Sequence, residues 1–268
     1  MIITSKQNQT IKDLIALRKR REREQAGVTL VDGFDELACA LECGVAVNHL
    51  YYCPELMSGE AHTIMLHKLL VGGSVPATEL ARPAFERVAY REGADGWLAV
   101  VSAIKTGLSQ LKLKSAPLIL VCESVEKPGN LGAMLRTADA AGADAVISVD
   151  AVTDWANPNI IRASKGAIFS VPVADTTQVE LRAWLDDNDI AVIAATPDTE
   201  MTYTEPDLTK GVALFIGTEK YGLSDFWLAG ADAKVRIPMV GKVNSLNAAT
   251  SGALLLYEAV RQRAGIQV

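Results

Sequence analysis

The sequence predicts an α/β protein with two domains, because strands and helices alternate in two separate series. With 268 residues, the chain is long enough for two domains that each bury a hydrophobic core. Short apolar runs alternate with segments of helical periodicity over residues 1–102 and again over residues 117–268. Residues 103–116 between them are polar and basic and lack a strong period, which favours a linker. A short extra helix packed on either domain is the alternative for this segment.

The first domain is expected to be a small α/β sandwich. It begins with a helix that Ser5 can cap and whose apolar residues recur at helical spacing, namely Ile11, Leu14, Ile15 and Leu17. The elements predicted after it are a strand at 28–31, a helix at 34–42, a strand at 50–53, a helix at 60–70, a strand around 75, a helical stretch interrupted by Pro83, and a strand at 97–101.

The second domain is expected to be a doubly wound α/β sheet. Its first segment, 117–122, has the length and composition of a buried parallel strand. The predicted order continues with a helix at 131–141, a strand at 145–149, a helix at 159–165, a strand at 170–173, a helix at 178–188, strands at 190–194, 213–216 and 234–237, and a helix at 248–263. The number of strands does not by itself specify their order in the sheet.

Composition indicates a cytoplasmic protein without a membrane span or a metal site. No apolar run approaches the length needed to cross a bilayer, and the N-terminal residues lack the features of a signal peptide. The four cysteines show no pairing framework, and the three histidines are scattered. Cys39 and Cys43 lie one helical turn apart, a spacing that without a second pair is typical of buried packing.

The charge distribution points to a possible nucleic-acid contact near the N-terminus. The formal net charge of -6 argues against such a partner. The first 24 residues nevertheless carry a local excess of four positive charges, because Asp13, Glu22 and Glu24 face seven basic residues, namely Lys6, Lys12, Arg18, Lys19, Arg20, Arg21 and Arg23. This run is either a solvated helix face or a patch that contacts phosphates.

Three stretches of the second domain place polar residues at the start of helices. In 126–138 a Pro-Gly turn leads into a helix, where Asn130 is expected as the cap and Arg136 projects from further along. In 214–224 an apolar strand runs into a Gly-rich loop and then a helix capped by Ser224. In 236–247 a short strand ends in a polar loop, and Ser245 or Asn247 can cap the last helix. Such turns make pockets for small polar ligands.

These stretches resemble the three motifs of the SpoU-type, or TrmH, family of RNA 2'-O-ribose methyltransferases. The family pattern Asn-x-Gly-x-x-x-Arg-Thr is present as Asn130, Gly132, Arg136 and Thr137. The pattern Gly-x-Glu-x-x-Gly begins at Gly217, and Ile-Pro-Met followed by Ser-Leu-Asn is present at 237–239 and 245–247. Residues 1–101 resemble the L30e-like substrate-binding domain of the rRNA-modifying members, with Asp32 where members often have Glu.

The resemblance implies a fold, a cofactor and a set of site residues. It implies a deep trefoil knot in the second domain and S-adenosylmethionine bound in the knotted loops. The implied cofactor contacts are Gly217, Thr218, Ile237, Met239 and Leu246. The implied catalytic residues are Asn130, Arg136, Glu219, Ser245 and Asn247.

The role of Arg136 has two versions. The family proposal is that the arginine takes the proton of the ribose hydroxyl, but a free guanidinium has a pKa above about 12 and is a poor base. The chemistry of a guanidinium favours a different role for Arg136, namely stabilising the developing alkoxide and orienting the adjacent phosphate. The structural alternative is an ion pair with Asp139 or Asp144.

The resemblance also implies a homodimer in which the arginine of one subunit faces the cofactor of the other. Small residues on the last helix fit close packing of that kind, but they fit packing within one subunit equally well. Between the motifs, Arg162 and Lys165 can hold RNA phosphate or serve the structure alone. Tyr203 can stack on a base, although an ordinary loop aromatic is the simpler interpretation.

Together these features predict an S-adenosylmethionine-dependent RNA ribose 2'-O-methyltransferase. The added N-terminal domain favours ribosomal RNA, and specifically 23S rRNA, over tRNA. A tRNA methyltransferase and an antibiotic-resistance rRNA methyltransferase remain alternatives within the family. The alternative from another class is a non-catalytic RNA-binding or ribosome-assembly protein.

Overall fold

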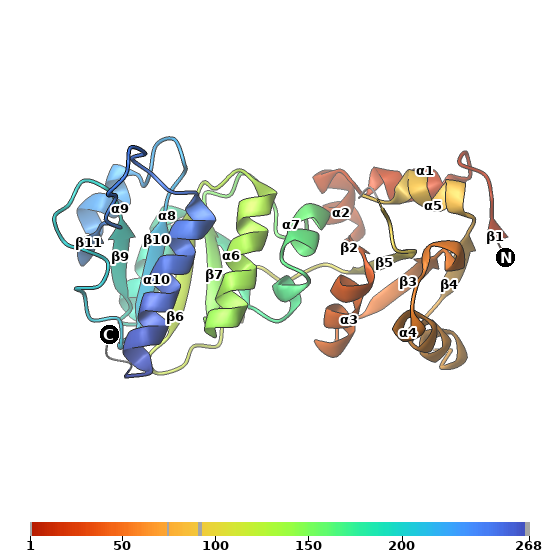
Figure 1. Cartoon of the computed structure of the whole chain (residues 1–268), viewed down its shortest axis with the longest axis horizontal. Coiled ribbons are helices and arrows are strands. Elements are labelled where there is room, and N and C mark those ends of the chain that lie inside the picture. Colours follow the sequence, from red (N-terminus) through yellow and green to blue (C-terminus); the bar gives the residue numbers. More distant parts are fainter. Residues whose placement is uncertain (1, 74, 91–92, 266–268) are drawn as a thin grey trace. The chain divides into compact units, whose positions relative to one another are not determined.

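The computed structural model describes residues 2–73, 75–90 and 93–265, and the chain forms two compact units. The first comprises Met1–Ile104 together with Asp154–Ser170, and the second comprises Lys105–Thr153 and Val171–Val268. Both are α/β units, as the sequence predicts (Figure 1). Within the described residues, no helix is long and apolar enough to cross a membrane.

The first unit is built on a mixed five-stranded sheet. Its strands β3 and β4 run parallel, whereas β5 pairs antiparallel with both β3 and β2. In spatial order the strands are β1 (Ile2–Ile3), β4 (Ala77–Leu80), β3 (Val47–Tyr52), β5 (Trp97–Ser102) and β2 (Val28–Asp32). The helices that come from the N-terminal part of the chain are α1 (Gln9–Ala16), α2 (Arg20–Ala26), α3 (Phe34–Glu42), α4 (Glu60–Val71) and α5 (Arg82–Val88), with a 3₁₀ turn η1 (Pro54–Leu56).

Helices α1 and α5 cover one side of this sheet and bury its main core. Ile11 and Leu14 of α1 and Phe85 of α5 pack with Leu30 and Leu98 from the strands.

Two local predictions for these helices are wrong. Asn8, not Ser5, caps α1, because the side chain of Asn8 accepts a hydrogen bond from the backbone N–H of Thr10. Pro83 stands in the first turn of α5, where its missing N–H costs nothing, and so does not interrupt the helix.

The segment Asp154–Ser170 packs with the first unit although it follows a strand of the second in sequence. It holds α7 (Pro158–Ala163) and η3 (Ala167–Phe169). The guanidinium of Arg23 donates to both carboxylate oxygens of Asp154 at 2.7 and 2.9 Å, and the two side chains are only 3% and 13% exposed. The hydroxyl of Thr29 donates to the carbonyl of Ala156, and the thiol of Cys39 donates to that of Gly166. Side chains of the N-terminal region therefore hold this segment.

The basic run near the N-terminus is partly structural. Arg23 is buried in the ion pair just described. Arg18 donates to the carbonyls of residues 87, 88 and 89 at the end of α5, and its guanidinium lies 4.9 Å from the ring centre of Tyr90. Arg20 forms an exposed pair with Glu24 one turn on. The proposed phosphate patch is thus smaller than the sequence indicates.

The second unit is built on a six-stranded sheet in which every pair is parallel. In spatial order its strands are β11 (Ala233–Val235), β9 (Ala191–Ala195), β10 (Val212–Ile216), β6 (Leu118–Glu123), β7 (Ala145–Val149) and β8 (Val173–Thr176). The helices are α6 (Pro128–Ala141), α8 (Gln178–Asp187), α9 (Asp225–Gly230) and α10 (Ala248–Arg263), and a 3₁₀ turn η2 (Leu108–Gln110) precedes β6.

Helices cover both faces of this sheet. On one face α6 and α10 lie side by side (Figure 1). A β carbon on Gly252 of α10 would contact the side chains of Leu120 and Met134. On the other face Leu181 of α8 and Trp227 of α9 pack with Ile119, Val121 and Phe215. Three leucines of the predicted linker, Leu108, Leu111 and Leu113, pack against the same core. This part of the linker segment therefore belongs to the second unit.

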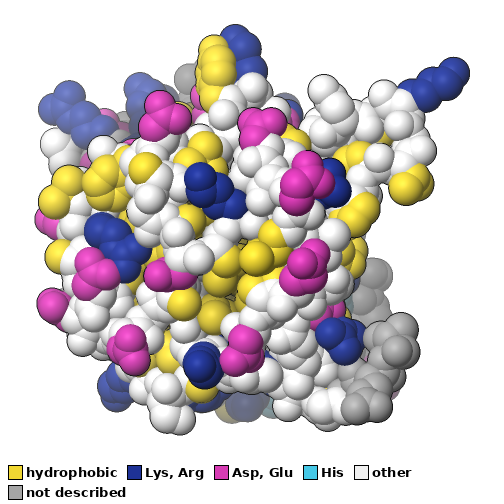
Figure 2. Space-filling model, turned by 90° about the vertical axis from the view of Figure 1, so that its left-hand side faces the viewer, with side chains coloured by type: hydrophobic (Ala, Val, Ile, Leu, Met, Phe, Trp, Pro, Cys, Tyr) yellow, Lys and Arg dark blue, Asp and Glu magenta, His cyan; other side chains and the backbone are white. Residues whose placement is uncertain are grey.

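The side of the second unit that carries β11 and α9 is chemically mixed. Hydrophobic side chains gather near the middle of this side, and acidic and basic side chains alternate around them (Figure 2). Positive charge therefore does not dominate this view of the unit.

Candidate functional site

The three sequence motifs meet at the carboxyl ends of the parallel strands. Strand β6 ends at Glu123, β10 at Ile216 and β9 at Ala195, and the loops that follow them lie at one edge of the sheet. This edge is where ligands bind in open parallel sheets. The last helix, α10, begins at the same edge.

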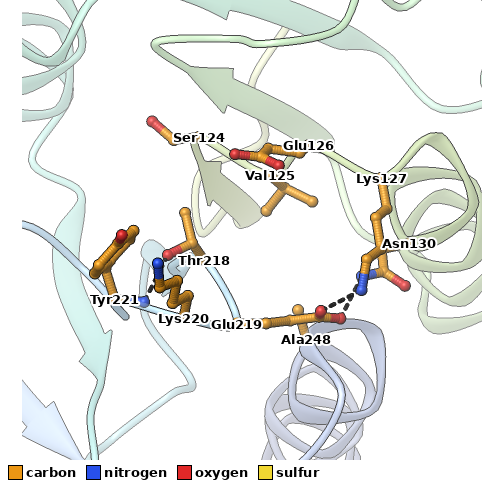
Figure 3. Close-up of a pocket in the computed structure, with 10 residues that line it drawn as sticks. All are labelled: Ser124, Val125, Glu126, Lys127, Asn130, Thr218, Glu219, Lys220, Tyr221 and Ala248. Carbon is orange, nitrogen blue, oxygen red and sulfur yellow. Dashed lines mark hydrogen bonds and ion pairs between the residues drawn. The ribbon is translucent and has the colours of Figure 1, made fainter.

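A carboxylate at the centre of the site joins the motifs. Glu219 Oε1 accepts a hydrogen bond from the amide nitrogen of Asn130 at 2.8 Å (Figure 3). It also accepts one from the amide nitrogen of Asn247 at 3.0 Å, and Asn247 donates as well to Asn130 Oδ1 at 3.2 Å. Lys127 Nζ donates to Glu219 Oε2 at 2.5 Å. The structure thus brings together three of the five predicted catalytic residues and adds Lys127 to them.

Each asparagine is positioned by the helix that carries it. Asn247 is the N-cap of α10, because its Oδ1 accepts from the backbone N–H of Ala249 at 2.9 Å. Of the two caps that the sequence allowed, Ser245 is therefore not the one used. Asn130 was expected to cap α6, but the helix begins at Pro128 and Lys127 occupies the cap position. Proline at the first position starts a helix readily, so Asn130 lies in the first turn and its side chain is free to reach Glu219.

The hydrogen bonds from Lys127 and then Asn130 lower the pKa of the Glu219 carboxyl below its ordinary value. Both donors stabilise the ionised form, and the ammonium of Lys127 adds its charge. Glu219 is therefore held as a carboxylate. A general base works best with a pKa near the operating pH, so this arrangement suits orientation more than proton removal.

The loop that carries Glu219 is a tight turn fixed at both ends. Thr218 and Gly222 exchange backbone hydrogen bonds of 2.9 and 3.0 Å, and the N–H of Tyr221 donates to the hydroxyl of Thr218. Gly222 has φ +69, in the left-handed region that favours glycine. A β carbon on Gly217 would overlap the backbone of Gly222, so the turn can fold back on its strand only if residue 217 is glycine.

Two hollows adjoin on either side of this turn. The first, of about 160 Å³, is lined by Asn130, Glu219 and Lys127, together with Ser124, Val125, Glu126, Thr218, Lys220, Tyr221 and Ala248. The second, of about 380 Å³, lies between the ends of β9 and β10 and the loop before α10. Gly217, Thr218, Ser245 and Leu246 line the second hollow, and Thr218 to Tyr221 also line the first.

A smaller recess of about 140 Å³ contains the remaining predicted cofactor residues. Ile237 and Met239 line it together with Ser245 and Leu246. Because the larger hollow shares Ser245 and Leu246, the five predicted cofactor residues surround one continuous region of the second unit.

Arg136 is placed apart from these hollows. It lies on α6 about one and a half turns beyond Asn130 and is exposed. It lines none of the three hollows described above. The acidic residue Asp144, named as a possible partner, instead pairs with Lys114 and accepts from the backbone N–H of Leu118.

Several lining residues escape the sequence reasoning. Ala195, Thr196 and Pro197 line the larger hollow from the end of β9, and Asn244 and Ser251 contribute polar groups to it. The signal for the first three was the position of their strand beside β10, which only the sheet order reveals. Lys127 lies in the first motif stretch, but nothing in its spacing from Glu219 indicates that the two side chains meet.

Fold and site together define an α/β protein that holds a small polar ligand beyond the carboxyl ends of a parallel sheet. The family models identify it more closely. Residues 117–257 match the SpoU rRNA Methylase family, and residues 8–99 match the MRM3-like substrate binding domain. The chain belongs to the SpoU rRNA methylase family.

Full-length relatives have the same organisation. The chain is 30% identical to a 23S rRNA (uridine(2479)-2'-O)-methyltransferase of Streptomyces viridochromogenes, over 92% of this chain and 87% of that one. It is 29% identical to a 23S rRNA (guanosine(2553)-2'-O)-methyltransferase of Bacillus subtilis, over 95% and 97% of the two chains. The crystal structure of the SpoU methyltransferase AviRb from S. viridochromogenes with the cofactor AdoMet superposes with a TM-score of 0.88, at 28% identity over 97% of this chain and all of that one.

Proposed function

We propose that this protein transfers a methyl group from S-adenosylmethionine to a ribose 2'-hydroxyl of 23S rRNA. The observation that carries the proposal is the Glu219 cluster, in which the three family motifs join beside a hollow of suitable size. The two relatives described above are named for 2'-O-methylation of 23S rRNA, and one solved relative holds the cofactor.

The larger hollow fits the cofactor. Its volume of about 380 Å³ lies within the range usual for small-molecule sites, roughly 300–1,000 Å³. Gly217 lets the turn approach its own strand closely, so backbone groups line the space. We infer that Gly217, Thr218, Ile237, Met239 and Leu246 hold S-adenosylmethionine, which when bound supplies a methyl group on a positively charged sulfur.

The residues of the chain then bind and orient the substrate. Asn130, Asn247 and Lys127 fix the Glu219 carboxylate in one position, and Ser245 lines the larger hollow from the loop before α10. A displacement at the methyl carbon depends on alignment, so rigid placement of these groups lowers the barrier. Arg136 is assigned to stabilise the charge that develops on the ribose oxygen and to bind the adjacent phosphate.

The position of Arg136 supports a homodimer. Within one chain it lines neither the hollow of the Glu219 cluster nor that of the cofactor residues. An arginine supplied by a second copy would complete the site. The small residues of α10 do not decide this, because Gly252, Leu256 and Ala259 are buried within the second unit itself.

The test is methyl transfer to RNA from cells that lack this protein. Purified rRNA and tRNA are incubated separately with labelled S-adenosylmethionine, and 2'-O-methylated riboses are mapped. Label at one ribose of 23S rRNA is the expected result, and label confined to tRNA would reject the substrate. Calorimetry supplies the independent check: without affinity for S-adenosylmethionine, a non-catalytic RNA-binding role would replace the enzyme.

A further inference from the structure

The turn between the two hollows carries a highly exposed aromatic ring. Tyr221 is 77% exposed, more than Tyr257 at 50% or Phe226 at 38%. It lines both the hollow of the Glu219 cluster and the hollow of the proposed cofactor residues. Figure 3 shows Tyr221 and Lys220 on one side of the hollow of the Glu219 cluster, with Lys127 and Asn130 on the other. The ring thus stands at the entrance to the site and not in the protein core.

The backbone under this ring is rigid. Hydrogen bonds from the N–H groups of Tyr221 and Gly222 to Thr218 fix the turn, as described above. The ammonium of Lys220 lies 4.7 Å from the centre of the ring, within the range of a cation–π contact. An exposed aromatic ring on a fixed backbone is suited to stacking on a ligand, because only the freedom of the side chain is lost on binding.

We propose that Tyr221 stacks on a base of the RNA substrate and that Lys220 contacts a neighbouring phosphate. Aromatic side chains are the usual platforms for unpaired bases, and a lysine beside them attracts the phosphate backbone. This inference rests on the proposed function for its substrate class. It adds a residue pair that lies inside the second motif but outside the motif's defining positions, Gly217, Glu219 and Gly222.

The charge of Lys220 favours RNA over the cofactor as the ligand that stacks on the Tyr221 ring. S-adenosylmethionine carries a positively charged sulfur, which a nearby ammonium repels, whereas RNA brings negative phosphates. Tyr221 and Lys220 also line the hollow of the Glu219 cluster, where Thr218 alone of the five predicted cofactor contacts lies.

The test compares variants that keep or remove the ring. Tyr221→Phe and Tyr221→Trp retain a stacking surface, whereas Tyr221→Leu and Tyr221→Ala do not. For methyl transfer to protein-free 23S rRNA, we expect the ring-free variants to raise KM roughly tenfold with little change in cofactor affinity, and the aromatic variants to stay near wild type. Val179→Ala, an exposed apolar position on α8, is the matched control and should change nothing.

A second readout separates this inference from the proposed reaction. Binding of a fluorescein-labelled oligouridylate is followed by anisotropy, and it should weaken in the ring-free variants and, with a shallower salt dependence, in Lys220→Ala. If wild type transfers no methyl group while oligonucleotide affinity still depends on the ring at position 221, that result would reject the proposed reaction and support the stacking site. If transfer proceeds with equal KM in all Tyr221 variants, or the oligonucleotide binds all of them alike, the inference is overturned. A loss of S-adenosylmethionine affinity in Tyr221→Ala would also overturn it, since the ring would then serve the cofactor.

Discussion

At the scale of single residues, the site depends on one carboxylate with several donors. Glu219 receives hydrogen bonds from Asn130, Asn247 and Lys127, which come from two other motif stretches. None of these donors is near Glu219 in sequence. The carboxylate therefore links the loops after β6 and β10 to the start of α10.

The first prediction concerns pH. The pKa of Glu219 is lowered in the folded protein, so the stability it contributes is present above its unfolded pKa and is lost as pH falls through its folded pKa. Lys127→Met removes the largest cause of the lowering and should move that loss to higher pH. Cofactor affinity measured by calorimetry from about pH 7 to about pH 4 should thus decline earlier in the variant. Lys234→Met, an exposed lysine on β11, is the control; coincident profiles for Lys127→Met and wild type would contradict the prediction.

The second prediction concerns Gly217. Gly217→Ala places a methyl group where the backbone of Gly222 now lies, so the turn must move away from its strand. We expect S-adenosylmethionine affinity to fall by at least roughly tenfold and the free energy of unfolding to drop by about 1–3 kcal/mol. Gly230→Ala, whose β carbon would meet no atom within 4 Å, is the control. Equal calorimetric affinities for Gly217→Ala and wild type would show that the turn does not shape the cofactor site.

At the scale of secondary-structure elements, α10 links stability to function through its N-cap residue. Asn247 caps the helix with its oxygen and donates to Glu219 and Asn130 with its nitrogen. The two roles use different atoms of one amide, so a substitution can separate them.

Asn247→Asp is the substitution that separates these roles. Aspartate is as good an N-cap as asparagine, so the unfolding free energy should change by less than about 0.5 kcal/mol. Its second oxygen cannot donate and would repel the Glu219 carboxylate, so methyl transfer should fall by at least roughly tenfold. Asn247→Ala loses both roles and should also lose about 1 kcal/mol of stability. Urea unfolding and single-turnover transfer measure the two effects, and full activity in Asn247→Asp would disprove the assigned donor role.

The next prediction concerns the segment Asp154–Ser170, which side chains of the N-terminal region contact. Removing one partner of the buried Arg23–Asp154 pair leaves an uncompensated charge, and Arg23→Met should cost about 3–5 kcal/mol in urea unfolding. Adding Asp154→Leu to that variant should recover much of the loss, since no charge is then left unpaired. Arg20→Met, in the exposed pair with Glu24, should cost under about 0.5 kcal/mol. Equal effects of Arg23→Met and Arg20→Met would mean that the buried pair does not hold the segment.

The elements could be predicted where a local signal exists. Helix α10 has the bounds that its periodicity and following polar residues indicate, and the bounds predicted for the mainly apolar strands β6, β7 and β10 agree with the structure within one residue. Strand β8 was predicted three residues early, because the apolar pair Val171 and Val173 precedes a polar strand end at 175–176 that carries no periodic signal. The cap of α6 was misassigned because Pro128 can start a helix as readily as Asn130 can cap one.

At the scale of the whole molecule, the chain passes between its two units at 104–105, 153–154 and 170–171. The sequence analysis expects a linker at 103–116, where composition changes, and it assigns 154–170 to the second domain. That assignment could not be improved from sequence, because the contacts of Arg23, Thr29 and Cys39 with this segment span more than a hundred residues. The same reason hid the meeting of Lys127 with Glu219. The trefoil knot stays a prediction of the family resemblance.

The last prediction concerns the assembly of the site from two chains. If Arg136 acts on the cofactor of a second copy, Arg136→Ala should bind S-adenosylmethionine normally and transfer no methyl group. At limiting S-adenosylmethionine, Gly217→Ala should fail for the opposite reason, because it keeps the arginine and binds the cofactor too weakly.

Mixing these two inactive variants restores one complete site in each heterodimer. At equal concentrations and with subunit exchange, half of the dimers are mixed, so roughly a quarter of wild-type transfer should return. Each variant mixed with itself is the control, and chromatography with light scattering establishes that exchange has occurred. If exchange is complete and transfer stays at zero, Arg136 acts within its own chain or not at all. Recovery near a quarter would instead place the arginine of one subunit at the cofactor of its partner, where the geometry of a single chain leaves it missing.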